Sequence, residues 1–292
     1  MRMMRPGIST ACLYPMEIER SLDLLLSMDF KLYEFFLNTW SELTPSFLRL
    51  LRNRLESAGA QVKSIHPFTS AIEGMLFFSE YLRRMEDALE FYKTYFEAAG
   101  MLGAKILVLH GQKGYRTGKI TEDEYIERYL RLYRLGQTFG ITVAQENVNQ
   151  FRSEDPGFIA RMKEKAGEEC AFVFDVKQAV RAGYDPLAMC RAMGDRLVHI
   201  HINDNAPGAD CLLPGCGGMD YTPLLDLLRA CGYGGDMMIE VYRTNFGDPE
   251  ELRSAGEYVS RLCDRYCATE CNQPAKFADS QTFSDSNAAF SS

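Results

Sequence analysis

The chain has 292 residues, of which 46% are hydrophobic and 25% charged, a composition typical of a folded globular protein. Its formal net charge of −8 argues against nucleic acid as a partner, because binding to phosphate backbones depends on clustered Lys and Arg. No apolar run reaches membrane-spanning length, MRMMRPGIST lacks a signal-peptide core, and nine cysteines in no zinc-finger or secreted spacing indicate free thiols, so we expect a cytoplasmic protein that does not contact membranes.

Short β-rich runs alternate along the chain with longer amphipathic segments. The runs predict strands at 6–12, 31–37, 61–67, 105–111, 141–148, 171–177, 197–204 and 236–242. The segments between them, such as SEYLRRMEDALEFYKTYFEAAG, predict helices, and several end in Gly just before the next strand. Eight strand–helix units in roughly 250 residues predict an α/β fold, a (β/α)8 TIM barrel. An open doubly wound sheet is the alternative, but PGISTACLYP is not the Gly-rich first turn that such sheets usually carry.

The C-terminal part of the chain differs in composition from the rest. The stretch at 272–292 is polar, Ser-rich and aperiodic, so we predict a single barrel domain at 1–262 and a largely disordered tail at 263–292. Cys263, Cys267 and Cys271 recur every four residues and would share one face of a helix. Their spacing is compatible with a metal site, but we interpret it as a chance run at the end of a terminal helix.

Six of the predicted strands end in a histidine or a carboxylate. These residues are His66, His110, Glu146, Asp175, His201 and Glu240. Active sites of TIM barrels lie at the C-terminal ends of the strands, so this position is where catalytic residues are expected. Because alternate strand residues face the barrel interior, Lys177, His199 and Tyr242 should point inward as well. The opposite face should then carry the apolar residues that meet the helices, namely Phe174, Val176, Ile200, Ile202, Ile239 and Val241.

Four of these strand ends form a set typical of a metal site. Burying three carboxylates together without a cation would cost free energy or force them to bind protons, and a divalent ion removes the conflict. We therefore predict that Glu146, Asp175, His201 and Glu240 bind one divalent metal ion. His199 lies one inward position deeper, where packing or support of another residue is more common than ligation.

The motifs LHG, AQENV, FVFDVKQA, RLVHIHINDN, LLPGCGGMDY and GDMMIEVY occur in this order. In this order they resemble the xylose isomerase-like TIM-barrel superfamily, and within it the sugar phosphate isomerase/epimerase branch, over roughly residues 5–262. The resemblance implies a single divalent ion, with manganese favoured over magnesium, cobalt or zinc. Carried over residue by residue, its ligands are Glu146, Asp175, His201 and Glu240. Because the superfamily includes dimers and tetramers, a homo-oligomer is an open possibility.

The chain departs from the superfamily patterns at several positions. Gln178 stands where a substrate-binding or zinc-binding histidine is expected, and no histidine follows His201. A three-zinc nuclease of the endonuclease IV type is therefore disfavoured, although His66 and His110 match positions that serve its extra ions. The Gly-rich loop reads Pro214-Gly215-Cys216-Gly217, and it is either a lid over the substrate or an ordinary turn.

The resemblance implies an isomerase of carbohydrate metabolism, acting on a sugar or sugar phosphate through an ene-diolate. Glu146 and Glu240 would exchange the proton as acid and base, and Lys177 would polarise a substrate oxygen. His66, His110, Gln178 and Arg243 would bind the substrate. The same chemistry fits an inosose-type dehydratase, and a non-catalytic sugar-binding barrel is a further alternative.

Overall fold

The computed structural model describes residues 3–114 and 119–270, and within these ranges eight parallel strands close into a barrel. Around the barrel each strand pairs with the next in the order β1, β2, β3, β4, β5, β6, β7, β10, and β10 returns to β1. Their bounds are β1 Pro6–Ser9, β2 Leu32–Phe36, β3 Gln61–His66, β4 Ile106–Leu109, β5 Thr142–Glu146, β6 Phe172–Asp175, β7 Leu197–Ile202 and β10 Met237–Ile239. The predicted TIM barrel is confirmed.

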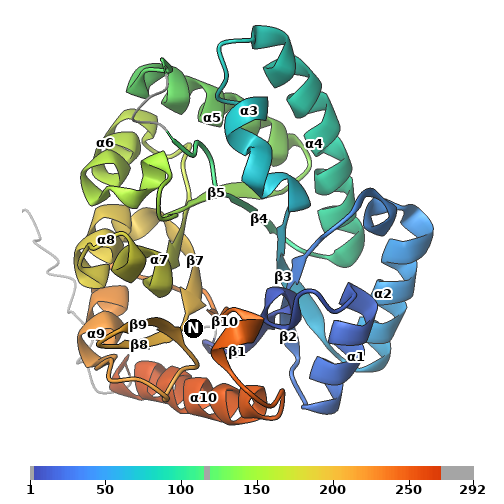
Figure 1. Cartoon of the computed structure of the whole chain (residues 1–292), viewed down its shortest axis with the longest axis vertical. Coiled ribbons are helices and arrows are strands. Elements are labelled where there is room, and N and C mark those ends of the chain that lie inside the picture. Colours follow the sequence, from blue (N-terminus) through green and yellow to red (C-terminus); the bar gives the residue numbers. More distant parts are fainter. Residues whose placement is uncertain (1–2, 115–118, 271–292) are drawn as a thin grey trace, which may run out of the picture.

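Helices form a ring around the strands, and α10 lies beside α1 where the ring closes (Figure 1). The α-helices are α1 Ile18–Ser27, α2 Pro45–Ser57, α3 Glu73–Leu76, α4 Leu82–Leu102, α5 Glu122–Thr138, α6 Pro156–Ala166, α7 Val176–Arg181, α8 Pro186–Met193, α9 Thr222–Ala230 and α10 Glu251–Glu270. Short 3-10 helices occupy η1 Thr10–Leu13, η2 Trp40–Leu43, η3 Phe68–Ile72, η5 Arg152–Glu154, η6 Gly194–Arg196 and η7 Arg243–Asn245. None of the helices in the described part of the chain is long and apolar enough to cross a membrane.

Local sequence signals explain where several helices begin and end. Helix α5 starts with a capping box, in which the Thr121 hydroxyl accepts from the Glu124 backbone N–H and the Glu124 carboxylate accepts from that of Thr121. Helix α6 begins at Pro156, and the side chain of the preceding Asp155 caps its N-terminus by accepting from the backbone N–H groups of the first turn. Helix α4 ends at Gly103, whose φ of 80° is the left-handed conformation that glycine adopts at no steric cost.

Two apolar layers stabilise the barrel. Alternate residues of β4, β5 and β6, with Ala171 directly before β6, fill its interior below the site; they are Ile106, Val108, Ala144, Ala171 and Val173. The opposite faces of the strands pack against the helices in one large core. The outward-facing residues that the sequence predicted, Phe174, Val176, Ile200, Ile202, Ile239 and Val241, all belong to this outer core. Side-chain alternation was therefore predicted correctly for the strands that carry the site.

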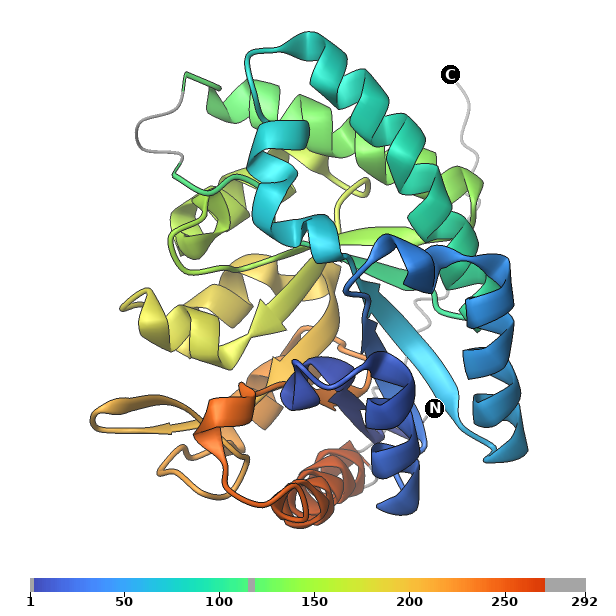
Figure 2. The same cartoon turned by 45° about the vertical axis from the view of Figure 1, so that its right-hand side comes forward.

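The structure also corrects the sequence-based boundaries. Several strands end earlier than predicted, so Lys177 lies in the first turn of α7 instead of in β6. An antiparallel hairpin, β8 Asp204–Ala206 with β9 Ala209–Leu212, was not predicted and projects from the barrel (Figure 2). Helix α10 continues past 262, with Cys263 buried and Cys267 partly buried in it. Cys271 and the rest of the predicted tail lie outside the described residues.

Candidate metal centre

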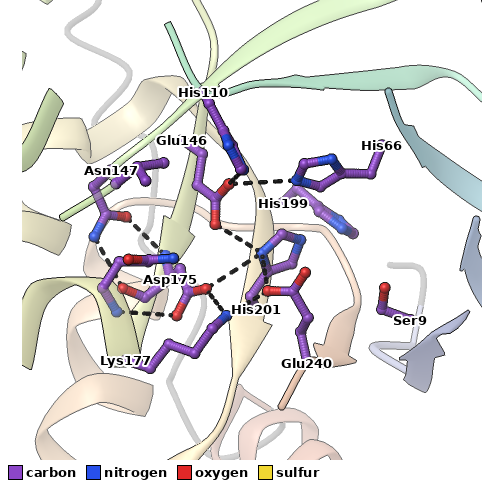
Figure 3. A network of polar contacts seen from close by, with 12 residues as sticks. Ser9, His66, His110, Glu146, Asn147, Asp175, Lys177, His199, His201 and Glu240 are labelled. Atoms are coloured by element: carbon purple, nitrogen blue, oxygen red, sulfur yellow. Dashed lines mark hydrogen bonds and ion pairs between the residues drawn. The ribbon is translucent and has the colours of Figure 1, made fainter. Parts of the chain in front are cut away.

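The four predicted metal ligands come together at the C-terminal mouth of the barrel (Figure 3). Glu146 ends β5, Asp175 ends β6 and Glu240 directly follows β10. His201 lies in β7 and is in register with Asp175 on one side and with Met238 of β10 on the other. Parallel pairing of neighbouring strands therefore brings residues far apart in sequence to one level of the barrel.

The Nδ1 atom of His201 faces all three carboxylates. It lies 3.1 Å from Glu146 Oε1, 3.2 Å from Glu240 Oε2 and 3.6 Å from Asp175 Oδ2. The four side chains offer ligand atoms that all lie within 4.8 Å of one another. Ligands about 2.1 Å from a divalent ion stand up to about 4.2 Å apart, so small side-chain shifts would suffice to surround one.

Lys177 provides a positive charge that two of these carboxylates contact directly. Its Nζ donates to Asp175 Oδ2 and to Glu240 Oε2, and the side chain is buried. Burial by itself would lower the pKa of Lys177, but Asp175 and Glu240 raise it well above its usual range. The residue is therefore a cation that holds two of the predicted ligands.

The balance of charge supports a bound cation. Among the described residues, the inward-facing groups around His201 include the carboxylates of Glu34, Glu146, Asp175 and Glu240 against the ammonium of Lys177. Three negative charges are thus left for protons or metal ions to neutralise. Without a metal ion, burial tends to lower the pKa of His201, yet Glu240 and Glu34 raise it well above its ordinary value. The residues present fit a divalent metal ion, whose charge would replace that proton.

The pKa values of two of the carboxylates reflect their basic neighbours. Burial tends to raise the pKa of Glu146, but His110, with hydrogen bonds from the surrounding histidines, lowers it well below its usual range. Burial likewise opposes the shift of Glu240, whose pKa His201 and Lys177 lower. Both side chains are therefore carboxylates at neutral pH, the form that binds metals or accepts protons.

His66 and His110 gather on the other oxygen of Glu146. His110 Nε2 lies 3.0 Å and His66 Nε2 lies 3.7 Å from Glu146 Oε2. The two rings pack edge to face with their centroids 4.5 Å apart (Figure 3). These three residues form a further group with metal-ligand spacing. Glu146 therefore stands between the predicted metal ligands on one side and this histidine pair on the other.

Two asparagines orient Asp175, and neither was predicted to belong to the site. Asn147 accepts from the Asp175 backbone N–H at 2.8 Å and donates to its carbonyl at 2.9 Å. Asn203 donates to Asp175 Oδ1 at 3.0 Å, which leaves Oδ2 directed toward His201. Their position in the sequence, directly after Glu146 and two residues after His201, is the signal that could have found them.

Glu34 is a further inward-facing carboxylate, and it was not predicted from the sequence. It lies in the middle of β2, is fully buried and contacts both His199 and His201. The signal was a single acidic residue inside the apolar run KLYEFFL. His199, predicted to lie deeper than His201, contacts this carboxylate with its Nε2 and packs edge to face against the ring of His201.

A cavity of about 550 Å³ opens above these residues. Its walls include the aromatic side chains of Tyr14, Phe36, Phe68 and Tyr242. It is also lined by Lys177 and by the predicted site residues His66, His110, Glu146, Gln178, Glu240 and Arg243. Asp175 and His201 are fully buried and do not line it. The residues expected to touch substrate thus border the cavity, and two predicted metal ligands are buried.

Comparison with known proteins agrees with the barrel fold. A family model described as xylose isomerase-like TIM barrel matches residues 22–262. The chain belongs to this family. The match covers β5, β6, β7 and β10, the strands that carry the predicted metal ligands.

Proteins similar in sequence or in fold match nearly the whole chain. An uncharacterized protein of Mycobacterium leprae is 25% identical over 285 residues, covering 89% of this chain and 96% of its own. D-psicose 3-epimerase from Clostridium cellulolyticum H10 superposes with a TM-score of 0.73 at 14% identity, covering 90% and 99%. The IOLI protein, solved with a bound zinc atom, gives a TM-score of 0.67 at 16% identity, covering 91% and 97%. At these identities the two solved structures establish the shared fold.

Proposed function

We propose that this xylose isomerase-like barrel is a divalent-metal-dependent isomerase or epimerase of sugars or sugar phosphates. The observation that carries the proposal is His201 Nδ1 facing three carboxylates beneath a cavity of about 550 Å³. A cavity of this size with a few convergent polar groups suits a small polar substrate. The fold shared with D-psicose 3-epimerase supports the sugar class.

In the proposed reaction, Glu146 and Glu240 act as acid and base. A divalent ion, with manganese favoured and magnesium, cobalt or zinc as alternatives, would polarise adjacent substrate oxygens and so acidify the neighbouring C–H. Glu146 and Glu240 come from β5 and β10, which are separated by β6 and β7, so they approach the cavity from different sides. One carboxylate takes the proton and either returns it or lets the other deliver it.

Four residues are proposed to orient the substrate. His66 and His110 offer ring nitrogens to hydroxyl groups, and Gln178 borders the cavity from the first turn of α7. Arg243 donates to the carbonyls of Phe246 at 2.9 Å and Gly247 at 3.0 Å, and no acidic side chain of the described residues lies within 4.0 Å of it. A guanidinium held in this way is available to a phosphate or hydroxyl group of the substrate.

The first test of the proposal is the metal content of the untagged protein, measured by elemental mass spectrometry. We expect about one divalent ion per chain in the wild type and its loss in His201→Ala. A wild-type protein that binds no metal after incubation with manganese or cobalt would contradict the proposal. Two or three zinc ions per chain would instead favour a nuclease.

The second test separates isomerisation from its alternatives. Ketoses and ketose phosphates are incubated with the metal-loaded protein in D2O, and products are followed by mass spectrometry and NMR. A product that contains deuterium and otherwise has the same composition as the substrate supports an isomerase or epimerase. A product that has lost one water molecule relative to the substrate indicates a dehydratase. A protein that binds sugars but exchanges no deuterium is a binding protein.

Glu146→Gln and Glu240→Gln should each lower turnover by about 10²–10⁴-fold, the usual loss for an acid or base, while the protein stays folded. Asp236→Asn is a matched control, because Asp236 is a buried carboxylate paired with Arg5 and Lys63 at the start of β10, away from the cavity. The control should keep its turnover at temperatures well below its unfolding midpoint. Near-wild-type turnover in both glutamine variants would contradict the assigned roles.

A further inference from the structure

Glu34 makes more contacts to buried polar groups than its place in an apolar strand would suggest. Its Oε2 accepts from the Ser64 hydroxyl at 2.8 Å and lies 3.1 Å from Nε2 of both His199 and His201. All four side chains are fully buried in the barrel, below the level of the cavity. Glu34 thus reaches the predicted ligand His201 from beneath.

The two ring nitrogens of His201 face different surroundings. Nδ1 faces the carboxylates of Glu146, Asp175 and Glu240, whereas Nε2 lies 3.1 Å from Oε2 of Glu34. A ring nitrogen that ligates a metal ion must present its lone pair, so a neutral His201 must carry its proton on Nε2. An ionised carboxylate only accepts hydrogen bonds, and beside Nε2 it stabilises that tautomer.

We propose that Glu34 is a positioning residue that holds His201 in the Nε2–H tautomer and directs its Nδ1 lone pair toward the metal site. The inference rests on the proposed function, because it assumes that His201 binds a metal ion. It adds a residue that contacts neither substrate nor metal and that acts through the ring of His201. Carboxylates that accept from the second nitrogen of a ligating histidine fix its orientation and raise its basicity.

Ser64 and His199 complete the surroundings of Glu34. The Ser64 hydroxyl, on the neighbouring strand β3, lies in register with Glu34 and also stands 3.1 Å from His199 Nε2. These donors satisfy the buried carboxylate oxygen that His201 also contacts. Ser64 is therefore as buried as His201 and contacts the same oxygen of Glu34, but it contacts none of the predicted metal ligands.

The test compares Glu34→Gln with the control Ser64→Ala in titrations of the metal-free protein with Mn²⁺ and Zn²⁺. An uncharged amide can either accept from Nε2–H or donate to Nε2, so it removes the preference for one tautomer. We expect the metal dissociation constant to rise by about 10–100-fold in Glu34→Gln. In Ser64→Ala we expect a change of less than about threefold, because the contact of Glu34 with His201 remains. A purely structural role would change stability in both variants and leave metal affinity alone.

A second readout uses the wild-type protein and does not depend on any variant folding. The chain has four histidines, so long-range ¹H–¹⁵N spectra of histidine-labelled protein are simple to assign with His201→Ala. We expect His201 to be protonated on Nε2 in the zinc-loaded wild type. A proton on Nδ1 there, or unchanged metal affinity in a folded Glu34→Gln protein, overturns the inference. Failure of the proposed function is distinguishable, since the wild type would then bind no metal at all.

Discussion

The residue that decides the electrostatics of the site is Lys177. Its ammonium contacts Asp175 and Glu240, and both the lysine and Asp175 are nearly inaccessible to solvent. Removing one partner of a buried ion pair leaves the other charge uncompensated, which costs more than the pair contributes. In the metal-free protein Lys177 therefore keeps the carboxylates together, and a bound metal ion would share this task.

Replacing Lys177 should make the stability of the folded protein depend more strongly on a bound metal ion. Lys177→Met is expected to lower the free energy of unfolding of the metal-free protein by about 3–5 kcal/mol. Added Mn²⁺ should restore more stability in the variant than it adds to the wild type, as measured by urea unfolding with and without metal. Lys165→Met, which removes an exposed ion pair with Asp123, is the control and should leave the free energy of unfolding nearly unchanged. An equal response to Mn²⁺ in both proteins would contradict this role.

Glu73 is a buried carboxylate outside the predicted metal centre. Its Oε2 accepts from the Gly111 backbone N–H at 2.7 Å and its Oε1 from the Tyr92 hydroxyl at 2.9 Å, which ties α3 to the segment after His110. Burial raises the pKa of Glu73, against the opposing effects of His110 and of the Gly111 N–H. The folded protein therefore binds this proton more tightly than the unfolded chain does.

The sign of this shift predicts a dependence on pH. Stability from a group with a raised pKa is present below the unfolded value, about 4.3 for Glu, and is lost as pH rises through the folded value. Glu73→Gln removes this loss, so its free energy of unfolding relative to wild type should increase from pH 4 to pH 8. Chemical unfolding in EDTA across this range measures the difference, with the exposed Glu56→Gln as control. If the free energies of unfolding of Glu73→Gln and wild type changed with pH in parallel, ionisation of the buried Glu73 would not destabilise the folded protein, and the prediction would be wrong.

At the scale of elements, the loop between β9 and α9 is organised by one buried carboxylate. Asp204 Oδ1 accepts from the backbone N–H of Asn205 and Met219 at 2.8 and 3.0 Å, and Oδ2 from those of Gly215 and Gly217 at 3.0 and 3.1 Å. A Cβ at Gly217 would collide with the Asp204 carboxylate, which explains the glycine there. None of the residues 213–219 lines the cavity of about 550 Å³, so the structure favours a fixed turn over a lid.

Loss of this carboxylate should release the loop. In Asp204→Asn we expect amide hydrogen exchange at Gly215, Gly217 and Met219 to accelerate at least about tenfold, because hydrogen bonds to a charged acceptor contribute about 1.5–3 kcal/mol each. Exchange in β5 and β6 should stay unchanged. Asp220→Asn serves as the control, because Asp220 lies in the same loop but accepts from the backbone N–H of Thr222 at the start of α9. Unchanged protection in Asp204→Asn would mean that the turn is held by its backbone alone.

At the scale of the whole molecule, the proposed metal ion joins strands from separate parts of the barrel. Its ligands come from β5, β6, β7 and the end of β10, so binding requires the closed barrel and is linked to folding. A metal ion present at 100 times its dissociation constant should stabilise the fold by about 2.7 kcal/mol. For a protein of this size we expect the unfolding midpoint to rise by about 5 °C. Calorimetry in EDTA and in Mn²⁺ measures this rise, and its absence, or its persistence in His201→Ala, would contradict the site.

The strand-end residues and the barrel could be predicted because they depend on local patterns. Alternation along a strand determines which residues face inward, and the repeated strand–helix order is compatible with few folds. His66, Glu146 and His201 accordingly border or lie beneath one cavity. The ends of the strands were less predictable. Helix α7 begins directly after Asp175, and its first residues continue the pattern of apolar and inward-facing side chains, so the sequence does not mark where β6 ends.

Sequence patterns alone are sufficient to predict the fold class, the faces of the strands and the set of polar residues at their ends. Which of these groups touch one another depends on the tertiary structure. Glu34 reaches His201 across the barrel because closure brings β2 opposite β7, and Asn147 meets Asp175 because β5 pairs with β6. Such contacts depend on which strands face one another and on the level at which each residue lies in the barrel. Neither can be predicted from the order of residues along a single strand.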